Sequence, residues 1–96
     1  MNSKFLYEKA VMLKEKMPIL LEKEDWGQLW DILHIPKVAW SGAVAEEYEA
    51  VRKMAVCSKR KDLVELLPNV IFYCIRYGET AEIQKVFPQL RLKKTQ

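Results

Sequence analysis

Apolar side chains recur at helical spacing along most of this chain. In the first segment Leu6, Ala10, Leu13 and Met17 follow one another at steps of four, three and four residues, with charged side chains between them. Steps of three and four place side chains on one face of a helix. The pattern therefore predicts an amphipathic helix, and Ser3 is the residue expected to cap its N-terminal end.

Pro18 interrupts this first helical pattern. Proline lacks a backbone N–H and disfavours the helical conformation at the residue before it, here Met17. It suits the first turn of a following helix that carries Ile19, Leu20 and Leu21. We expect a kink at Pro18 or a new helix starting there, with the two segments forming one bent rod.

A second helical pattern begins after Glu24 and Asp25, whose negative charges suit a helix N-terminus. The apolar residues that follow share one stripe, and the helix is predicted to end near Ile35 and Pro36. We expect this stripe, including both of its tryptophans, to face the core. Its members are Trp26, Leu29, Trp30 and Leu33.

The stretch PKVAWSG at residues 36–42 has the composition of a loop. Trp40 lies in this loop and is the tryptophan with the best chance of being exposed; packing as a cap on the core is the alternative. Ser41 is expected to cap the next helix, whose acidic residues come first and whose basic residues come last, as the helix dipole favours. The stripe of that helix consists of Val44, Tyr48, Val51 and Ala55.

The most apolar part of the chain is LVELLPNVIFYCIRY at residues 63–77. Asp62, with Glu65 three residues later, fits a capping box at its start. Because apolar side chains occur all round this helix, we expect it to be the central element. Pro68 is too far from Asp62 to be a first-turn proline, so we expect it to kink the helix or to divide it in two.

Gly78 predicts the end of this apolar helix, with the glycine in the left-handed conformation. Thr80 is expected to cap a last short helix that carries Ile83 and stops at Pro88. The basic residues 91–96 are predicted to form a frayed tail.

Together these patterns predict an all-α protein, a compact bundle of five to six short helices in a single domain over residues 1–96. Composition supports this class, because three glycines and four prolines are too few for the turns of an all-β fold. Half of the residues are hydrophobic, which is enough for a packed core.

We expect a cytoplasmic protein without a membrane span. Charges near the start interrupt any apolar run, so no secretory signal is recognised. The longest uncharged stretch, residues 66–75, is far shorter than a membrane-spanning helix. Cys57 and Cys74 form no paired motif and are expected to be reduced thiols.

Catalytic chemistry has few candidate residues in this chain. His34 is the only histidine, and no serine lies in a nucleophile motif. A zinc site would need His34, Cys57 and Cys74 to converge from distant segments, without the close-spaced ligand pairs typical of such sites. The three glycines are isolated, so no loop is suited to phosphate. We predict a protein that is not an enzyme, with no catalytic residues, metal, cofactor or small-molecule substrate.

Aromatic residues are abundant for so small a chain, with three Trp, four Tyr and three Phe. A small core has limited room, so part of this apolar surface is expected to remain exposed as a docking patch. We predict a non-enzymatic protein–protein interaction module, which either self-associates as a homo-oligomer or acts as a small adaptor or regulatory subunit. The interface candidates are Trp40, Val38 and Tyr77.

A basic face is the alternative functional surface. The chain carries 16 basic and 13 acidic residues, which gives a net charge of +3. If the basic side chains share one continuous face, they favour a small helical subunit associated with nucleic acid, whereas scattered ones contradict it. The candidates are Arg52, Lys53, Lys59, Arg60, Lys61, Arg91, Lys93 and Lys94.

Two segments resemble death-fold domains. EDWGQLWDILHI is similar to the second helix of that family, in which an acidic residue and Trp precede a Leu-rich turn. CIRYGETAEIQKVFPQL is similar to the last two helices of the family with their Gly-containing turn. The resemblance covers under a third of the chain, and PKVAWSG stands where the family has a short third helix. It implies a six-helix module that assembles with its own kind through charged and apolar faces.

Overall fold

The computed structural model describes residues 2–92. Within this range the chain is helical without any strand, which confirms the predicted all-α class. Six α-helices and three single-turn 3₁₀ helices of these residues pack around one apolar core. They are α1 (Ser3–Lys23), α2 (Trp26–Ile32), η1 (Lys37–Ala39), α3 (Gly42–Cys57), α4 (Lys61–Val64), α5 (Leu67–Tyr77), η2 (Gly78–Thr80), α6 (Ile83–Val86) and η3 (Pro88–Leu90).

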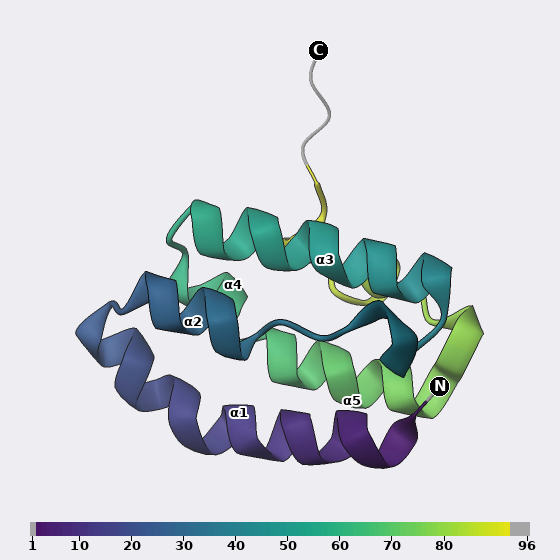
Figure 1. Ribbon diagram of the computed structural model, residues 1–96. Coiled ribbons are helices and arrows are strands. Elements are labelled where there is room, and N and C mark those ends of the chain that lie inside the picture. Colours follow the sequence, from purple (N-terminus) through teal and green to yellow (C-terminus); the bar gives the residue numbers. More distant parts are fainter. Residues whose placement is uncertain (1, 93–96) are drawn as a thin grey trace.

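α1 is one continuous helix that runs through Pro18. Its cap is Asn2, whose side-chain oxygen accepts a hydrogen bond at 3.0 Å from the backbone N–H three residues later, so the prediction of Ser3 as the cap was wrong by one residue. Pro18 removes one backbone hydrogen bond, and Figure 1 shows the helix bending in its last third. The predicted bent rod therefore forms, because Met17 and Leu21 are buried on either side of the proline.

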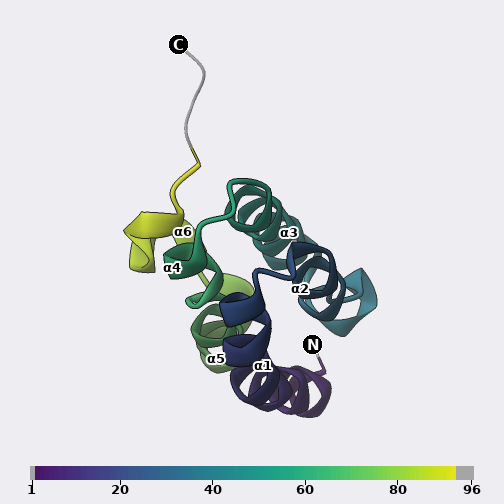
Figure 2. The same cartoon turned by 90° about the vertical axis from the view of Figure 1, so that its left-hand side faces the viewer.

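α1 packs antiparallel against α5, and this pair forms the most extensive helix contact within residues 2–92. Figure 1 shows the two helices running in opposite directions, and Figure 2 shows them side by side when seen from their ends. The prediction that the apolar segment is central is confirmed for α5. The side chains buried in this layer are Leu6, Ala10, Leu13, Met17 and Leu21 of α1 and Leu67, Pro68, Val70, Ile71 and Cys74 of α5.

α2 and α3 lie together on the other side of the core (Figure 2). Asp25 caps α2 as predicted, because its carboxylate accepts a hydrogen bond from the N–H of Gln28 at 3.2 Å. The end of α2 is fastened to α3 by Tyr48, whose buried hydroxyl donates to the carbonyl of Leu33 at 2.7 Å. This bond matters because a carbonyl left without a partner in the core would destabilise the fold.

The predicted apolar stripe of α2 is confirmed in its leucines and only partly in its tryptophans. Leu29 and Leu33 are fully buried. Trp26 and Trp30 are half-buried and pack against the edge of the core. Their large rings therefore cover the core instead of filling it.

The apolar segment at residues 63–77 is divided between α4 and α5. Pro68 stands in the first turn of α5, where its missing N–H needs no partner, so of its two predicted effects division is the one observed. The predicted capping box at Asp62 was wrong. Its carboxylate accepts two hydrogen bonds from the guanidinium of Arg60, at 3.0 and 2.6 Å, and caps no helix.

α6 is capped by a side chain from another helix. The carboxylate oxygens of Glu47 on α3 accept hydrogen bonds from the N–H groups of Ile83 and Gln84, at 3.3 and 3.2 Å. Thr80 was predicted to be the cap, but its hydroxyl donates to the carbonyl of Tyr77 at 2.7 Å. A distant carboxylate thus satisfies the free N–H groups that no neighbour in the sequence reaches.

The C-terminal part of the chain stays packed as far as Leu92. Gly78 ends α5 as predicted, and its φ of 58° favours glycine, but its ψ of −134° differs from the predicted left-handed helical conformation. Leu90 is fully buried, and the N–H of Leu92 donates to the side-chain oxygen of Gln84 at 3.0 Å. Residues 91–92 are placed in this way, and the frayed tail stays a prediction for residues 93–96, which lie outside the described part.

Replacing Ile71 by Ala tests the core between α1 and α5. Ile71 is fully buried, so Ile71→Ala is expected to lower the free energy of unfolding by about 2 to 5 kcal/mol. Urea denaturation followed by circular dichroism measures this change. Asn69→Ala on the exposed side of the same helix is the matched control, expected within about 0.5 kcal/mol of the wild type. Equal effects of the two substitutions would contradict the assignment of the core.

Candidate functional site

Trp40 is buried, so it is not the exposed interface anchor that its position in a loop suggested. Only 5% of it is exposed, and its ring packs against that of Tyr48 with the centroids 4.8 Å apart. The segment around it is fastened to the start of α1, because the N–H of Asn2 donates to the carbonyl of Ala39 at 2.7 Å. Trp40 therefore caps the core. Ser41 stands at the N-cap position of α3 as predicted, but its hydroxyl makes no capping hydrogen bond.

The other two interface candidates are exposed on different elements. Val38 is 95% exposed in η1, where it lines a shallow cavity of about 160 Å³ with Phe5 of α1. Tyr77 is 49% exposed at the end of α5, and its ring centroid lies 4.8 Å from that of Tyr73. Tyr77 thus belongs to an aromatic surface of α5, whereas Val38 belongs to the joint between η1 and α1.

Five aromatic side chains line the solvent side of α5. Tyr7 of α1 meets Phe72 edge to face, with the ring centroids 5.7 Å apart. On the other flank of α5, Tyr73 meets Phe87 edge to face at 5.7 Å and also contacts Tyr77. Such geometries are favourable for aromatic pairs. We call Tyr7, Phe72, Tyr73, Tyr77 and Phe87 the aromatic strip.

Two positive charges lie over rings of the aromatic strip. The ammonium nitrogen of Lys14 is 5.4 Å from the ring centroid of Phe72, and the guanidinium carbon of Arg76 is 5.7 Å from that of Tyr77. Cations at these distances are attracted to the ring faces. The hydroxyl of Tyr73 accepts a hydrogen bond at 2.8 Å from the backbone N–H just before α6, which holds that ring in place. The strip thus combines ordered rings with cations.

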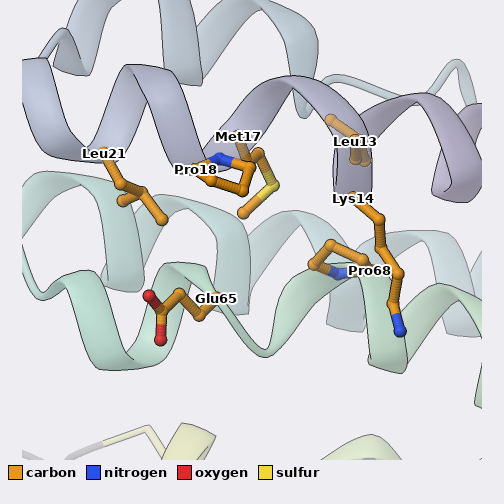
Figure 3. Close-up of a pocket in the computed structure, with 7 residues that line it drawn as sticks. All are labelled: Leu13, Lys14, Met17, Pro18, Leu21, Glu65 and Pro68. Atoms are coloured by element: carbon orange, nitrogen blue, oxygen red, sulfur yellow. The ribbon is translucent and has the colours of Figure 1, made fainter.

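A groove between α1 and the α4–α5 junction adjoins the aromatic strip through Lys14 (Figure 3). Figure 3 shows Met17 and Pro18 on one side of the groove and Glu65 and Pro68 on the other. Because Pro18 has no N–H, the backbone carbonyl of Lys14 lacks its usual helical partner beside this groove. The volume is about 180 Å³. Its lining consists of Leu13, Lys14, Met17, Pro18, Leu21, Glu65 and Pro68.

Sequence reasoning found only Tyr77 among the residues of the strip. The apolar residues all round residues 63–77 predict a central helix and do not tell which of them stay at the surface; α5 buries one face and leaves Phe72 and Tyr73 partly exposed. Helical spacing carries a signal for this surface, since both lie on the side opposite Cys74 and Leu67. Tyr7 and Phe87 join it only through tertiary contacts.

Arg52 is buried, so it does not belong to the predicted basic face. Only 3% of its side chain is exposed, and its guanidinium carbon lies 3.5 Å from the ring centroid of Trp30. It donates one hydrogen bond to the backbone carbonyl of Trp30 at 2.7 Å and another to the carboxylate of Glu49. Burial, assisted by the charge of Arg52, lowers the pKa of Lys9 on α1. Arg52 therefore joins α2 to α3 instead of meeting a ligand.

The other basic candidates are exposed but do not form one uniformly positive face. Lys53 lines a cavity together with the acidic residues Glu46 and Glu49. Lys59 stands in the turn after α3, with a φ of 54°. Arg60 and Lys61 face carboxylates, whereas Arg91 is exposed and shares a cavity with Arg60. Lys93 and Lys94 lie outside the described residues.

The two cysteines differ in accessibility. Both are free thiols, and Cys57 is exposed while Cys74 is buried. Burial is the main cause that raises the pKa of Cys74 to about 12, with a smaller effect of Glu47. The Cys74 thiol is therefore protonated at neutral pH.

Metal-ligating side chains do not gather within residues 2–92. No group of three or more His, Cys, Asp or Glu residues in this part of the chain is arranged to hold a metal ion. His34 is exposed at the end of α2.

None of the described helices combines the length and the apolar character that crossing a membrane requires.

Comparison with known proteins yields no relative. No family model matches the chain, and no curated protein and no solved structure is significantly similar to it. The resemblance to death-fold domains therefore stays a prediction, and the surfaces described above are the basis for a proposal about function.

Replacing Arg52 tests its structural role. Arg52→Ala removes the contact with the Trp30 ring and leaves the Trp30 carbonyl without its donor, so it is expected to lower the free energy of unfolding by about 2 to 4 kcal/mol. Lys53→Ala, at the next and exposed position, is the control and is expected to change it by less than about 0.5 kcal/mol. Urea denaturation of both variants gives the comparison. A fully stable Arg52→Ala protein would show that Arg52 does not hold α2 on α3.

The thiols give a second test of burial. A thiol-reactive chromogenic reagent at about pH 8 is expected to modify Cys57 within minutes and Cys74 only after unfolding, because a thiol reacts as its thiolate. The native protein thus shows one fast thiol, and the unfolded protein shows two. Cys57→Ser is the control that removes the fast phase. Rapid reaction of a second thiol in that native variant would contradict the burial of Cys74.

Proposed function

We propose that this chain is a non-enzymatic protein–protein interaction module whose docking surface is the aromatic strip. The observation that carries the proposal is the presence of two ring groups on the flanks of α5, each with a cation over one ring: Tyr7 and Phe72 with Lys14, and Tyr73, Tyr77 and Phe87 with Arg76. Exposed Tyr and Phe, together with Arg, are characteristic of protein interfaces. Two free thiols also suit a reducing compartment such as the cytoplasm.

We infer that a second copy of the same chain is the occupant of the strip. A two-fold interface requires a patch that complements itself. The strip carries both kinds of group that such an interface pairs, namely the cations Lys14 and Arg76 and the exposed rings of Tyr7 and Tyr77. A stable interface takes roughly 800 Å² from each partner, about an eighth of the 6128 Å² surface of the chain. Binding to a different protein, as an adaptor or regulatory subunit, is the competing outcome.

Nucleic-acid binding has less support. It requires a row of cations free to contact phosphates, but Arg52 is buried, and Arg60 and Lys61 face carboxylates. Lys53 lies beside acidic residues on another part of α3. Protein association is therefore better supported than a nucleic-acid-associated role.

Light scattering coupled to size-exclusion chromatography tests the proposal. Between about 5 and 500 µM, the molar mass is expected to rise from 11.3 kDa towards twice that value. Tyr7→Ser and Tyr77→Ser are expected to weaken association at least about tenfold, because exposed aromatic anchors supply much of the binding free energy. Moderate salt is expected to have little effect, since the burial of apolar area is only weakly screened.

Val38→Ser is the matched control, because it removes an exposed apolar side chain from a different surface. Its dissociation constant is expected to stay within about twofold of the wild type. Circular dichroism shows that the variants remain folded. A constant monomer mass at every concentration, or equal effects of Val38→Ser and Tyr77→Ser, would overturn self-association through the strip.

A further inference from the structure

A second cavity lies away from the aromatic strip, between the end of α3, the start of α4 and the C-terminal segment. Its volume is about 540 Å³, three times that of the groove between α1 and α4. Volumes of this size are typical of specific binding pockets. The lining consists of Met54, Ser58, Arg60, Leu63, Gln89, Arg91 and Leu92.

The walls of this cavity are held by buried or hydrogen-bonded residues. Leu63 is 4% exposed and anchors the α4 side, while fully buried Leu90 anchors the opposite side. The N–H of Leu92 donates to the side chain of Gln84, and the N–H of Arg91 donates to the carbonyl of Pro88 at 3.1 Å. The C-terminal segment therefore forms one wall of the cavity, and hydrogen bonds fix the position of the Arg91 backbone in this wall.

Arg91 is the cation of this cavity without an ion pair among the described residues, and Arg60 adds the N–H donors that its pair with Asp62 leaves over. Arg60 donates two hydrogen bonds to Asp62, through Nε and one N–H of Nη2. A guanidinium has five N–H donors, so three of them remain free of Asp62. Arg91 is exposed and forms no ion pair within residues 2–92. The positive charge of Arg91 thus has no counterpart in the described part of the chain.

We propose that this cavity binds an acidic segment of a partner polypeptide, in which a carboxylate stands next to an apolar side chain. The carboxylate is held by Arg60 and Arg91, since guanidinium groups bind carboxylates through paired hydrogen bonds. The apolar neighbour packs against Met54, Leu63 and Leu92.

The apolar lining favours a peptide over a nucleic acid. A phosphate backbone needs a row of cations and offers nothing to pack against apolar side chains. The cavity provides two arginines beside Met54, Leu63 and Leu92, and the nearby Lys61 already faces Glu24. Mixed acidic and apolar character is therefore the chemistry that complements it.

Fluorescence anisotropy of the full chain tests this site. The probe is a labelled peptide of about ten residues with alternating Asp and Leu, and the control probe has Asn in place of each Asp. We expect a dissociation constant of roughly 10 to 100 µM for the acidic peptide and a loss of at least about tenfold with the amide peptide, because the charge-assisted hydrogen bonds are removed. Arg91→Gln is expected to weaken the acidic peptide by about tenfold.

Lys53→Gln is the matched variant, because it removes the same charge from an exposed position outside the cavity. We expect it to change binding by less than about twofold. Tyr77→Ser leaves the affinity unchanged if the two surfaces are independent, so failure of this proposal is distinguishable from failure of self-association. Equal effects of Arg91→Gln and Lys53→Gln overturn the proposal. So does a labelled oligothymidine that binds more tightly than the peptide and loses its affinity in Arg91→Gln.

Discussion

One whole face of α5 is buried in the core, where it packs against α1. Leu67, Val70, Ile71 and Cys74 turn inward against the apolar face of α1. Because a helix has a fixed angular spacing, this choice places Phe72 and Arg76 on the opposite side and Tyr73 on one flank, while Tyr77, seven residues after Val70, lies at the edge of the buried face. The α1–α5 contact thus leaves Phe72 and Tyr73 at the surface, and tertiary contacts bring Tyr7 and Phe87 to them. An aromatic surface fixed in this way on a central helix is rigid, which reduces the entropy lost when it binds.

The other half of the fold depends on polar contacts that are buried or nearly so. Arg52 stacks on Trp30, and Tyr48 donates to the carbonyl of Leu33. Both contacts tie α3 to the short helix α2, which has a single fully buried side chain of its own and gains little from apolar packing. Glu47 also joins α3 to α6, because its carboxylate accepts hydrogen bonds from the first N–H groups of α6. α3 is therefore the element that fixes the short helices, while α1 and α5 supply most of the apolar core.

The two proposed surfaces lie on different parts of the fold. The aromatic strip is carried mainly by α5, whereas the cavity with Arg60 and Arg91 is formed where the C-terminal segment returns to α3 and α4. One surface is built from rings, and the other from two arginines beside apolar side chains. Surfaces of such different chemistry suit two different partners. A chain that pairs with itself through the aromatic strip therefore leaves the cavity with Arg60 and Arg91 open to another protein.

Local sequence determined the class of the fold, the buried stripes of α1 and α3, the start of α2 at Asp25 and the end of α5 at Gly78. These features are local, since each depends on residues within one or two turns. A kink or a division at Pro68 was also predicted, because a proline without an N–H disrupts a helix at its own position; division is what the structure has.

Tertiary structure alone decided the fate of the residues whose partners are distant in the sequence. For Trp40 both exposure and packing on the core were open, and it is buried against Tyr48. Arg52 was a candidate for a basic face and is stacked on Trp30, 22 residues away. Glu47 caps a helix 36 residues later. No local pattern marks such pairs, because a side chain's environment depends on which helix the fold brings beside it.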